Sequence, residues 1–153
     1  MIRDALARID PKAAALAGVA AGAAYLLVQS ADNRLTGRNL DDRILLAGPF
    51  VRDPGRAKAA GTAIHLANSL AFSGLYAAIE PNLPGPPWWK GVLFFNVENV
   101  VLYPALVFRR HHPSIREGVI ADYWTWRAFF QSIPRHVAFG AVLGIAYDRL
   151  TRR

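Results

Sequence analysis

The chain has 153 residues, of which 53% are hydrophobic and 19% charged, and this length suits a single domain. It contains no cysteine, which excludes disulfides, thiolate metal sites and thiol catalysis. Lysine and arginine number 18 against 11 acidic residues. The basic residues cluster at the ends of apolar segments, which argues against nucleic-acid binding and favours contact with anionic lipid headgroups.

The first apolar segment, residues 13–30, predicts a membrane-spanning helix. Asp10 is a suitable N-cap, and Pro11 suits the first helical position because that position needs no N–H donor. Gly18 and Gly22 form a GxxxG motif, which lets a second helix approach closely. A signal peptide has a similar basic start, apolar middle and small residues near its end, but we expect this helix to be retained.

Residues 31–57 are polar and rich in turn-forming residues. Their apolar piece, residues 44–51, is too short to cross a membrane, so we expect it to lie on the surface or re-enter the bundle. Asp41, Asp42 and Arg43 are expected to be solvated charges in this loop.

The second predicted span covers residues 58–79 and carries polar side chains on one face. Gly61, His65 and Asn68 recur at helical spacing, and lipid tolerates such groups poorly, so this face is expected to point into the bundle. The proline-rich loop at 80–91 is short. It therefore predicts that the second and third spans pack as an antiparallel hairpin.

The third predicted span, residues 88–108, is the strongest membrane signal in the chain. A hydrocarbon core of about 30 Å needs roughly 20 apolar residues in a helix. Trp88 and Trp89 open the segment and Arg109 and Arg110 close it, and both residue types are favoured at membrane interfaces.

A segment that mixes aromatic and basic residues follows at 109–133, and it predicts a short interfacial helix anchored by Trp124 and Trp126. The last span is then expected to begin after this segment. A helix that began at Tyr123 instead would place Arg135 deep in the membrane, at a high desolvation cost.

The last predicted span covers residues 134–150. Ser132 is expected to cap it, with Pro134 in the first turn. Gly140 and Gly144 form a second GxxxG motif, which again indicates close helix packing.

Together these segments predict an all-α fold: a four-helix integral membrane bundle forming one transmembrane domain over residues 1–153. The loops at 31–57 and 109–133, with Lys58 and Arg135, carry eleven basic residues, against seven at the termini and in the proline-rich loop. The positive-inside rule then places both termini outside. The basic residues on the two sides of the first span do not decide the orientation.

From about Gly61 the chain resembles a family of small bacterial inner-membrane proteins, the YagU-like family. The resemblance rests on G-x-x-x-H-L-x-N-S at 61–69, L-Y-A at 75–77, P-G-P at 84–86 and R-H-x-x-F-G-x-x-L-G at 135–144. It covers roughly the last ninety residues. The resemblance implies a multi-pass protein of the bacterial inner (plasma) membrane, and it implies no catalytic residue.

Polar residues of three predicted spans are expected at similar depths, since each helical residue rises about 1.5 Å. We expect one polar cluster of seven residues: His65, Asn68, Asn96, Glu98, Asn99, Arg135 and His136. The first interpretation is structural, because buried polar side chains join membrane helices by hydrogen bonds. The second is proton or solute handling, because an intramembrane glutamate beside histidine is typical of relays. The third is a haem held between His65 and His136.

The sequence contains no nucleophile elbow, phosphate-binding loop or HExxH motif. The adjacent His111 and His112 favour a solvated pair over a metal site. We therefore expect a non-enzymatic membrane protein without a cofactor, an accessory or interaction subunit of a larger membrane complex. Its expected partners are lipids and other integral membrane proteins or further copies of itself, because one GxxxG face would remain free for a partner. The alternatives are a small transporter or channel using the buried cluster, or a haem-binding electron carrier.

Overall fold

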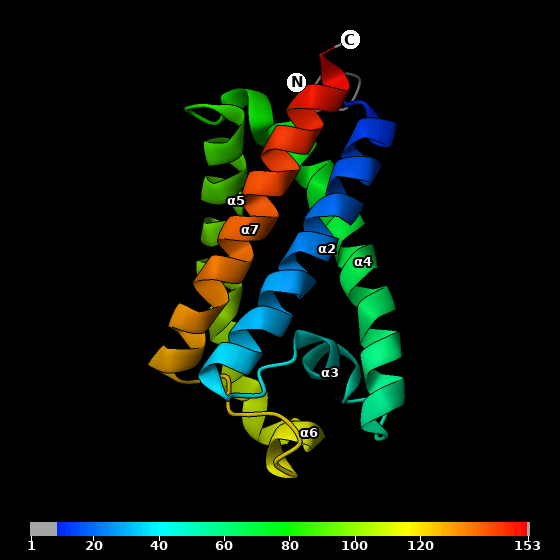
Figure 1. Cartoon of the computed structure of the whole chain (residues 1–153), viewed down its shortest axis with the longest axis vertical. Coiled ribbons are helices and arrows are strands. Elements are labelled where there is room, and N and C mark those ends of the chain that lie inside the picture. The colour runs from blue at the N-terminus through cyan, green and yellow to red at the C-terminus, as the bar shows by residue number, and fades with distance from the viewer. Residues whose placement is uncertain (1–8, 153) are drawn as a thin grey trace.

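The computed structural model describes residues 9–152, and within them every regular element is helical (Figure 1). The elements are α2 (Pro11–Thr36), α3 (Asp42–Ala47), α4 (Pro54–Ile79), η1 (Glu80–Asn82), α5 (Pro87–Leu102), η2 (Tyr103–His111), α6 (Pro113–Arg116) and α7 (Trp126–Thr151). The all-α prediction is therefore confirmed. The terminal residues 1–8 and 153, some of which enter the count of basic residues, lie outside the described part.

The starts of the long helices follow from local capping chemistry. The Asp10 side chain accepts a hydrogen bond from the Ala13 N–H at 2.9 Å, and Asp53 does the same for Arg56 at 2.8 Å. A proline follows each of these caps, in the position that needs no N–H donor. Helix α2 ends at Gly37, whose φ of 66° is the left-handed conformation that favours glycine.

Two predicted boundaries are wrong. The third span is not one α-helix over 88–108, because it tightens into the 3₁₀ segment η2 at Tyr103, next to Pro104. The last helix does not begin at residue 134. It begins at Trp126, capped by the Thr125 hydroxyl, which accepts from the Ala128 N–H at 3.1 Å.

Pro134 therefore lies inside α7, and residues 126–133 of the predicted interfacial segment form the first turns of α7. The only earlier helix in the described part of 109–133, apart from the end of η2, is the single turn α6. The desolvation cost of burying Arg135 inside a long helix is offset by acidic partners from α2 and α3. The sequence prediction did not anticipate these partners.

The four long helices lie side by side in the order α5, α7, α2, α4 (Figure 1). The closest packing is between α5 and α7, between α7 and α2, and between α2 and α4. The predicted hairpin of the second and third spans is thus wrong as a close pair. Helices α4 and α5 meet through aromatic side chains, such as Phe72 with Phe95 at 6.0 Å between ring centroids.

Small residues explain this order. Gly18 and Gly22 of α2 lie against Ser73 and Ser69 of α4, and a Cβ on either glycine would collide with those serines.

The second GxxxG motif packs in the same manner against α5. A Cβ on Gly140 would collide with the backbone of Gly91, and a Cβ on Gly144 would collide with the Pro87 carbonyl. Both motifs are therefore used inside the chain, and the expectation that one remains free for a partner is wrong.

Helix α3 lies across one end of the bundle, beside α4 (Figure 1). As expected, its segment is too short to cross a membrane. Its buried Ile44 and Ala47 form a second small core with residues that precede and begin α7, including Tyr123 and Ala128. The main core lies between the four long helices.

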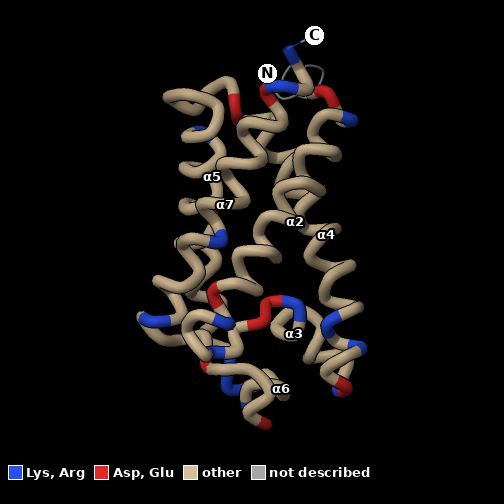
Figure 2. Tube along the Cα trace, in the orientation of Figure 1, with Lys and Arg blue, Asp and Glu red and all other residues tan. Residues whose placement is uncertain are grey.

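Charged residues gather at the two ends of the bundle and are sparse between them (Figure 2). Residues 13–31 of α2 and 59–79 of α4 contain no charged side chain. Within the described chain, two segments are long and apolar enough to cross a membrane: Pro11–Thr36 and Pro87–His111. The structure thus supports membrane association in this coarse form.

Candidate functional site

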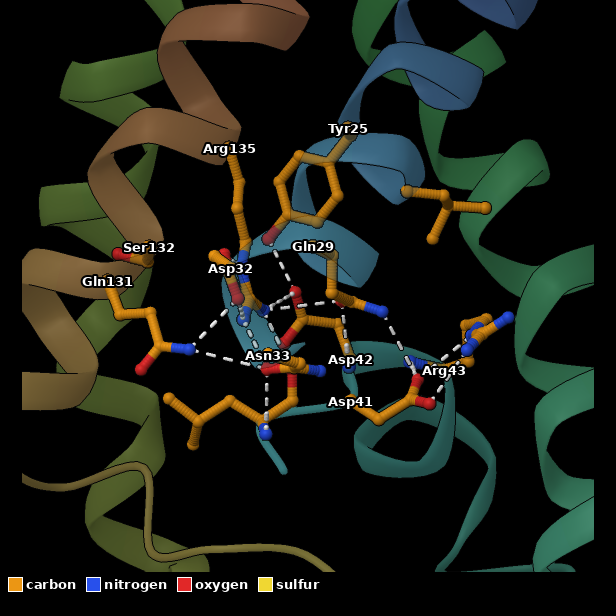
Figure 3. A network of polar contacts seen from close by, with 12 residues as sticks. Tyr25, Gln29, Asp32, Asn33, Asp41, Asp42, Arg43, Gln131, Ser132 and Arg135 are labelled. Atoms are coloured by element: carbon orange, nitrogen blue, oxygen red, sulfur yellow. Dashed lines mark hydrogen bonds and ion pairs between the residues drawn. The ribbon is translucent and has the colours of Figure 1, made fainter. Parts of the chain in front are cut away.

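Arg135 of α7 is the centre of a buried ion network at the α3 end of the bundle (Figure 3). It is only 1% exposed. Its Nε and Nη2 donate to the two carboxylate oxygens of Asp32 at 2.5 and 2.7 Å, and Nη1 donates to Asp42 at 3.0 Å. Further acceptors are the Leu40 carbonyl at 2.9 Å and the amide oxygens of Gln29 and Asn33. Every guanidinium nitrogen is thus bonded, as a buried charge requires.

Asp42, at the start of α3, receives donors from three parts of the chain. Besides Arg135, the hydroxyl of Tyr25 donates to it at 2.6 Å and that of Tyr123 at 2.8 Å. Burial and the neighbouring Asp42 carboxylate raise the pKa of Tyr123 well above 10. The hydroxyl therefore keeps its proton at neutral pH and remains a donor.

Asp41 caps α3 and is 2% exposed. Arg43 donates to both of its carboxylate oxygens, at 2.9 and 2.8 Å, and Gln29 donates at 3.2 Å. Burial alone would raise the pKa of Asp41, but the hydrogen bonds and charge of Arg43 outweigh it and lower that pKa. The prediction that Asp41, Asp42 and Arg43 are solvated loop charges is wrong, because α3 turns both carboxylates inward.

The seven residues of the predicted polar cluster do not all lie together in the structure. His65, Asn68, Glu98 and His136 line one partly open cavity of about 200 Å³. Arg135 points instead into the ion network.

The two asparagines of α5 beside Glu98 do not line this cavity. Asn99 donates to the Ser132 hydroxyl of α7 at 3.0 Å, and Asn96 donates to the Val92 carbonyl of its own helix at 2.9 Å. Ser132 is thus a contact between helices and not a helix cap.

The cavity lies where α4 and α5 diverge, with side chains of α2, α3 and α7 completing its wall. Three phenylalanines line it: Phe72, Phe95 and Phe139. Tyr25 and Asp42 face both the cavity and the ion network, so the two regions share a boundary.

Glu98 and His136 face each other across the cavity wall. Their Oε2 and Nε2 atoms are 3.4 Å apart, and both side chains are mostly buried, at 16% and 13% exposure. Oε2 of Glu98 has no hydrogen-bond partner among the described residues, since the geometry to His136 falls short of one. The Nδ1 atom of His136 lies 2.8 Å from the Ser132 carbonyl. A carbonyl only accepts, so Nδ1 carries a proton.

A neutral His136 therefore presents an unprotonated Nε2 to the Oε2 atom of Glu98, which has no hydrogen-bond donor. Two acceptors face each other, and one added proton converts the contact into a hydrogen bond or an ion pair. With a neutral His136, the contact between the two side chains therefore lacks one proton.

Comparison with known proteins identifies the family of this chain. Residues 9–153 match the family of unknown function DUF6789. The chain belongs to that family. No curated protein and no solved structure matches it. The YagU-like resemblance stays a prediction, since none of these findings bears on it.

The histidines of this DUF6789 protein do not fit a haem held between them. Nε2 of His65 is bonded to the Gly22 carbonyl at 3.2 Å, which leaves only Nδ1 of that ring for a ligand. The Tyr25 ring packs against both imidazoles and occupies space beside each, with ring centroids 5.0 Å from His65 and 5.2 Å from His136.

Other predicted site residues are placed as follows. His112 contacts the Leu45 carbonyl of α3 through Nε2 at 2.9 Å, so it is not a solvated partner of His111. The described residues contain no group of three or more potential metal ligands.

The expected tryptophan anchors form two pairs. Trp88 and Trp89 open α5, whereas Trp124 and Trp126 precede and open α7 at the opposite end of the bundle. All four are at least 38% exposed, as interface anchors are.

Proposed function

We propose that the protein is a non-enzymatic, four-span membrane protein whose Glu98–His136 pair takes up and releases protons at the partly open cavity. This places it in the transporter or channel class. The observation that carries the proposal is the single missing proton between Oε2 and Nε2. A protein that needed Glu98 only for packing gains nothing from an acid without a hydrogen-bond donor, because such burial is costly.

The membrane part of the proposal is supported by the position of the charges. Helix α2 is uncharged from residue 13 to 31, a rise of about 28 Å at 1.5 Å per residue, close to one hydrocarbon core. The Arg135 network lies at one end of this band, where long side chains reach the interface. An inner-membrane location rests on the YagU-like resemblance.

Single cysteines test the membrane insertion of α2 and α5, since the chain has none of its own. Leu27 and Val97 are 72% and 54% exposed in the isolated chain. If lipid covers them, cysteines there should resist an aqueous maleimide in native membranes and label after denaturation. Leu35, 87% exposed beyond the uncharged band, is the matched control and should label readily. Rapid labelling at all three positions would contradict membrane insertion.

The proton function is tested in liposomes that contain the purified protein and a pH-sensitive dye. Glu98→Gln should abolish protein-dependent proton movement, because the amide keeps the shape but cannot exchange the proton. Glu117→Gln is the matched control, since Glu117 is exposed and pairs with Arg52 outside the cavity. Equal proton movement in wild type and Glu98→Gln would refute the proposal.

A role as accessory subunit, or assembly with further copies, is the second candidate. The observation in its favour is the outer face of α5, where Val97, Val100 and Val101 are each more than half exposed. Lipid covers such a face equally well, so copurification in mild detergent decides. Stoichiometric recovery of a second membrane protein that Val100→Trp abolishes would support this role, whereas a monomer of wild-type mass would exclude it.

A further inference from the structure

An open groove of about 400 Å³ lies where η2 meets the start of α7. Its wall is apolar and mostly aromatic, and it includes Val100, Tyr103, Pro104, Trp124 and Trp126. The volume is within the range of small-molecule sites, about 300–1,000 Å³. Val100 is 57% exposed and Trp126 is 77% exposed, so the groove is open to the surroundings of the bundle.

Contacts within the chain hold the wall of this groove in place. The Tyr103 hydroxyl donates to the carbonyls of Tyr123 and Thr125, at 2.6 and 2.8 Å. The Tyr103 ring stacks on Trp124, with ring centroids 5.4 Å apart, and meets Phe129 edge-on at 4.9 Å. The segment before α7 is thus fixed against η2, and the groove is formed without a ligand.

A basic pocket of about 460 Å³ lies further along η2. It is lined by Val107, Arg109, Arg110, Ile115 and Asp122. Arg109 pairs with Asp122 at 2.7 Å. Arg110 is exposed and forms no ion pair with another residue of the described chain. The pocket therefore carries an excess of positive charge, which attracts an anion.

The aromatic groove and the basic pocket lie on the same face of η2. Residues three apart share a face of a 3₁₀ helix, and Pro104 lines the groove whereas Val107 and Arg110 line the pocket. From Pro104 to Arg110 the helix rises about 12 Å at 2.0 Å per residue. Arg110 is at the end of the candidate span Pro87–His111, where that span would leave the membrane. One headgroup layer is roughly 5–8 Å thick, so Pro104 then lies at the depth of the acyl chains.

We propose that this face of η2 binds one anionic phospholipid, with its phosphate at Arg110 and an acyl chain in the aromatic groove. Basic pockets beside membrane helices attract anionic headgroups, and tryptophan and tyrosine rings favour the headgroup boundary. A zwitterionic lipid fills the groove equally well, but its own cation offsets the phosphate charge at the arginine. A soluble anion uses the arginine and leaves the groove empty. The inference rests on the membrane insertion proposed above and not on the Glu98–His136 pair.

Native mass spectrometry of the full-length protein in detergent tests the charged part of the site. Dioleoyl phosphatidylglycerol and dioleoyl phosphatidylcholine are the probes, since they have the same chains and differ in headgroup charge. The wild-type protein should prefer phosphatidylglycerol, and Arg110→Gln should reduce that preference about fivefold, as expected for one arginine at a charged membrane surface. Arg34→Gln is the matched control, because Arg34 is exposed at the same end of the bundle but lies outside the groove and the pocket.

The aromatic part of the site has its own variant. Trp126→Ala removes an exposed ring from the groove wall, so it should weaken the binding of both lipids and leave the preference between them unchanged. Glycerol phosphate, which has the charge without the chains, should not displace phosphatidylglycerol. Displacement by an equal concentration of glycerol phosphate would show that the pocket takes a soluble anion, which would overturn the inference.

Two further outcomes would also overturn it. Equal affinity of the wild-type protein for both lipids would show that the groove selects chains alone. Equal loss of preference in Arg110→Gln and Arg34→Gln would show that only the summed charge of this end attracts lipid.

The lipid site and the proton function can fail separately. Glu98→Gln should keep the wild-type lipid preference, and loss of the preference in that variant would refute a separate site. A preference that depends on Arg110, in a protein that moves no protons, supports the lipid site and refutes only the proton function.

Discussion

Arg135 and His136 are neighbours on α7, yet they face regions of opposite character. The guanidinium of Arg135 has an acceptor for every nitrogen. Nε2 of His136 faces Glu98 at 3.4 Å without a hydrogen bond. A fully satisfied buried network rigidifies a fold, whereas an unsatisfied pair beside a cavity is costly unless it has a use. The comparison indicates a structural role for the Arg135 network, and it is the reason for proposing a function at the Glu98–His136 pair.

The largest expected effect comes from Arg135→Met. It leaves Asp32 and Asp42 buried without their cation, which should cost about 3–5 kcal/mol of the free energy of unfolding. Thermal unfolding in detergent, followed by the fluorescence of the four tryptophans, measures the loss. Arg152→Met is the control, since that arginine pairs with Asp148 at the exposed end of α7. If Arg135→Met melted at the wild-type temperature, Arg135 would not have the structural role proposed here.

A second prediction concerns the position of α7, which carries both regions. Gly144→Ala places a methyl group against the Pro87 carbonyl and should destabilise the protein by about 1–3 kcal/mol. It should also reduce proton movement, because His136 and Glu98 lie on the two helices that are pushed apart.

The matched control is Gly74→Ala, where the new methyl group meets nothing within 4 Å. This change should be neutral or stabilise α4 by up to about 1 kcal/mol, since alanine favours helices. If the two alanine variants melt at the same temperature, the close contact of Gly144 with α5 does not determine how α5 and α7 pack.

The smallest effect is expected from acid acting on Asp41. The pKa of Asp41 is lowered in the folded protein, so its contribution to stability is present above the ordinary aspartate value of about 3.9. That contribution is lost as the pH falls through the lowered pKa. Unfolding of wild type and Asp41→Asn should therefore differ at pH 7 and converge as the pH falls below about 4. If the stability difference between wild type and Asp41→Asn grew in acid, the pKa of Asp41 would be raised in the folded protein and not lowered.

Much of the fold could be predicted from the sequence because it depends on local chemistry. The uncharged length of α2 and α4, the aspartate–proline starts and the aromatic ends are all visible in single segments. The GxxxG motifs indicated close packing correctly. Their partners could not be predicted, because a single segment does not show which helix Ser69, Ser73 or Gly91 will contact.

The candidate site was predicted only in part for the same reason. His65, Asn68, Glu98 and His136 are polar residues in apolar segments, so they stand out. Asp32 and Asp42 do not, because they lie among polar residues at a helix end and in a turn-rich segment.

Arg135 was the residue from which the ion network could have been predicted. A buried arginine needs acidic partners, and α2 and α3 supply them to Arg135 when α7 begins at Trp126, after the Thr125 cap. The proline at 134 argued for a later start, and the Thr125 cap together with the ion network outweighs that preference.

One paired measurement on Glu98→Gln tests the contrast between the two regions most directly. Thermal unfolding and proton movement are measured on the same purified variant. The account predicts that stability stays within about 1 kcal/mol of wild type or rises, because a buried charge is removed, while proton movement is lost. A variant that loses stability as Arg135→Met does, yet still moves protons once reconstituted, would contradict it.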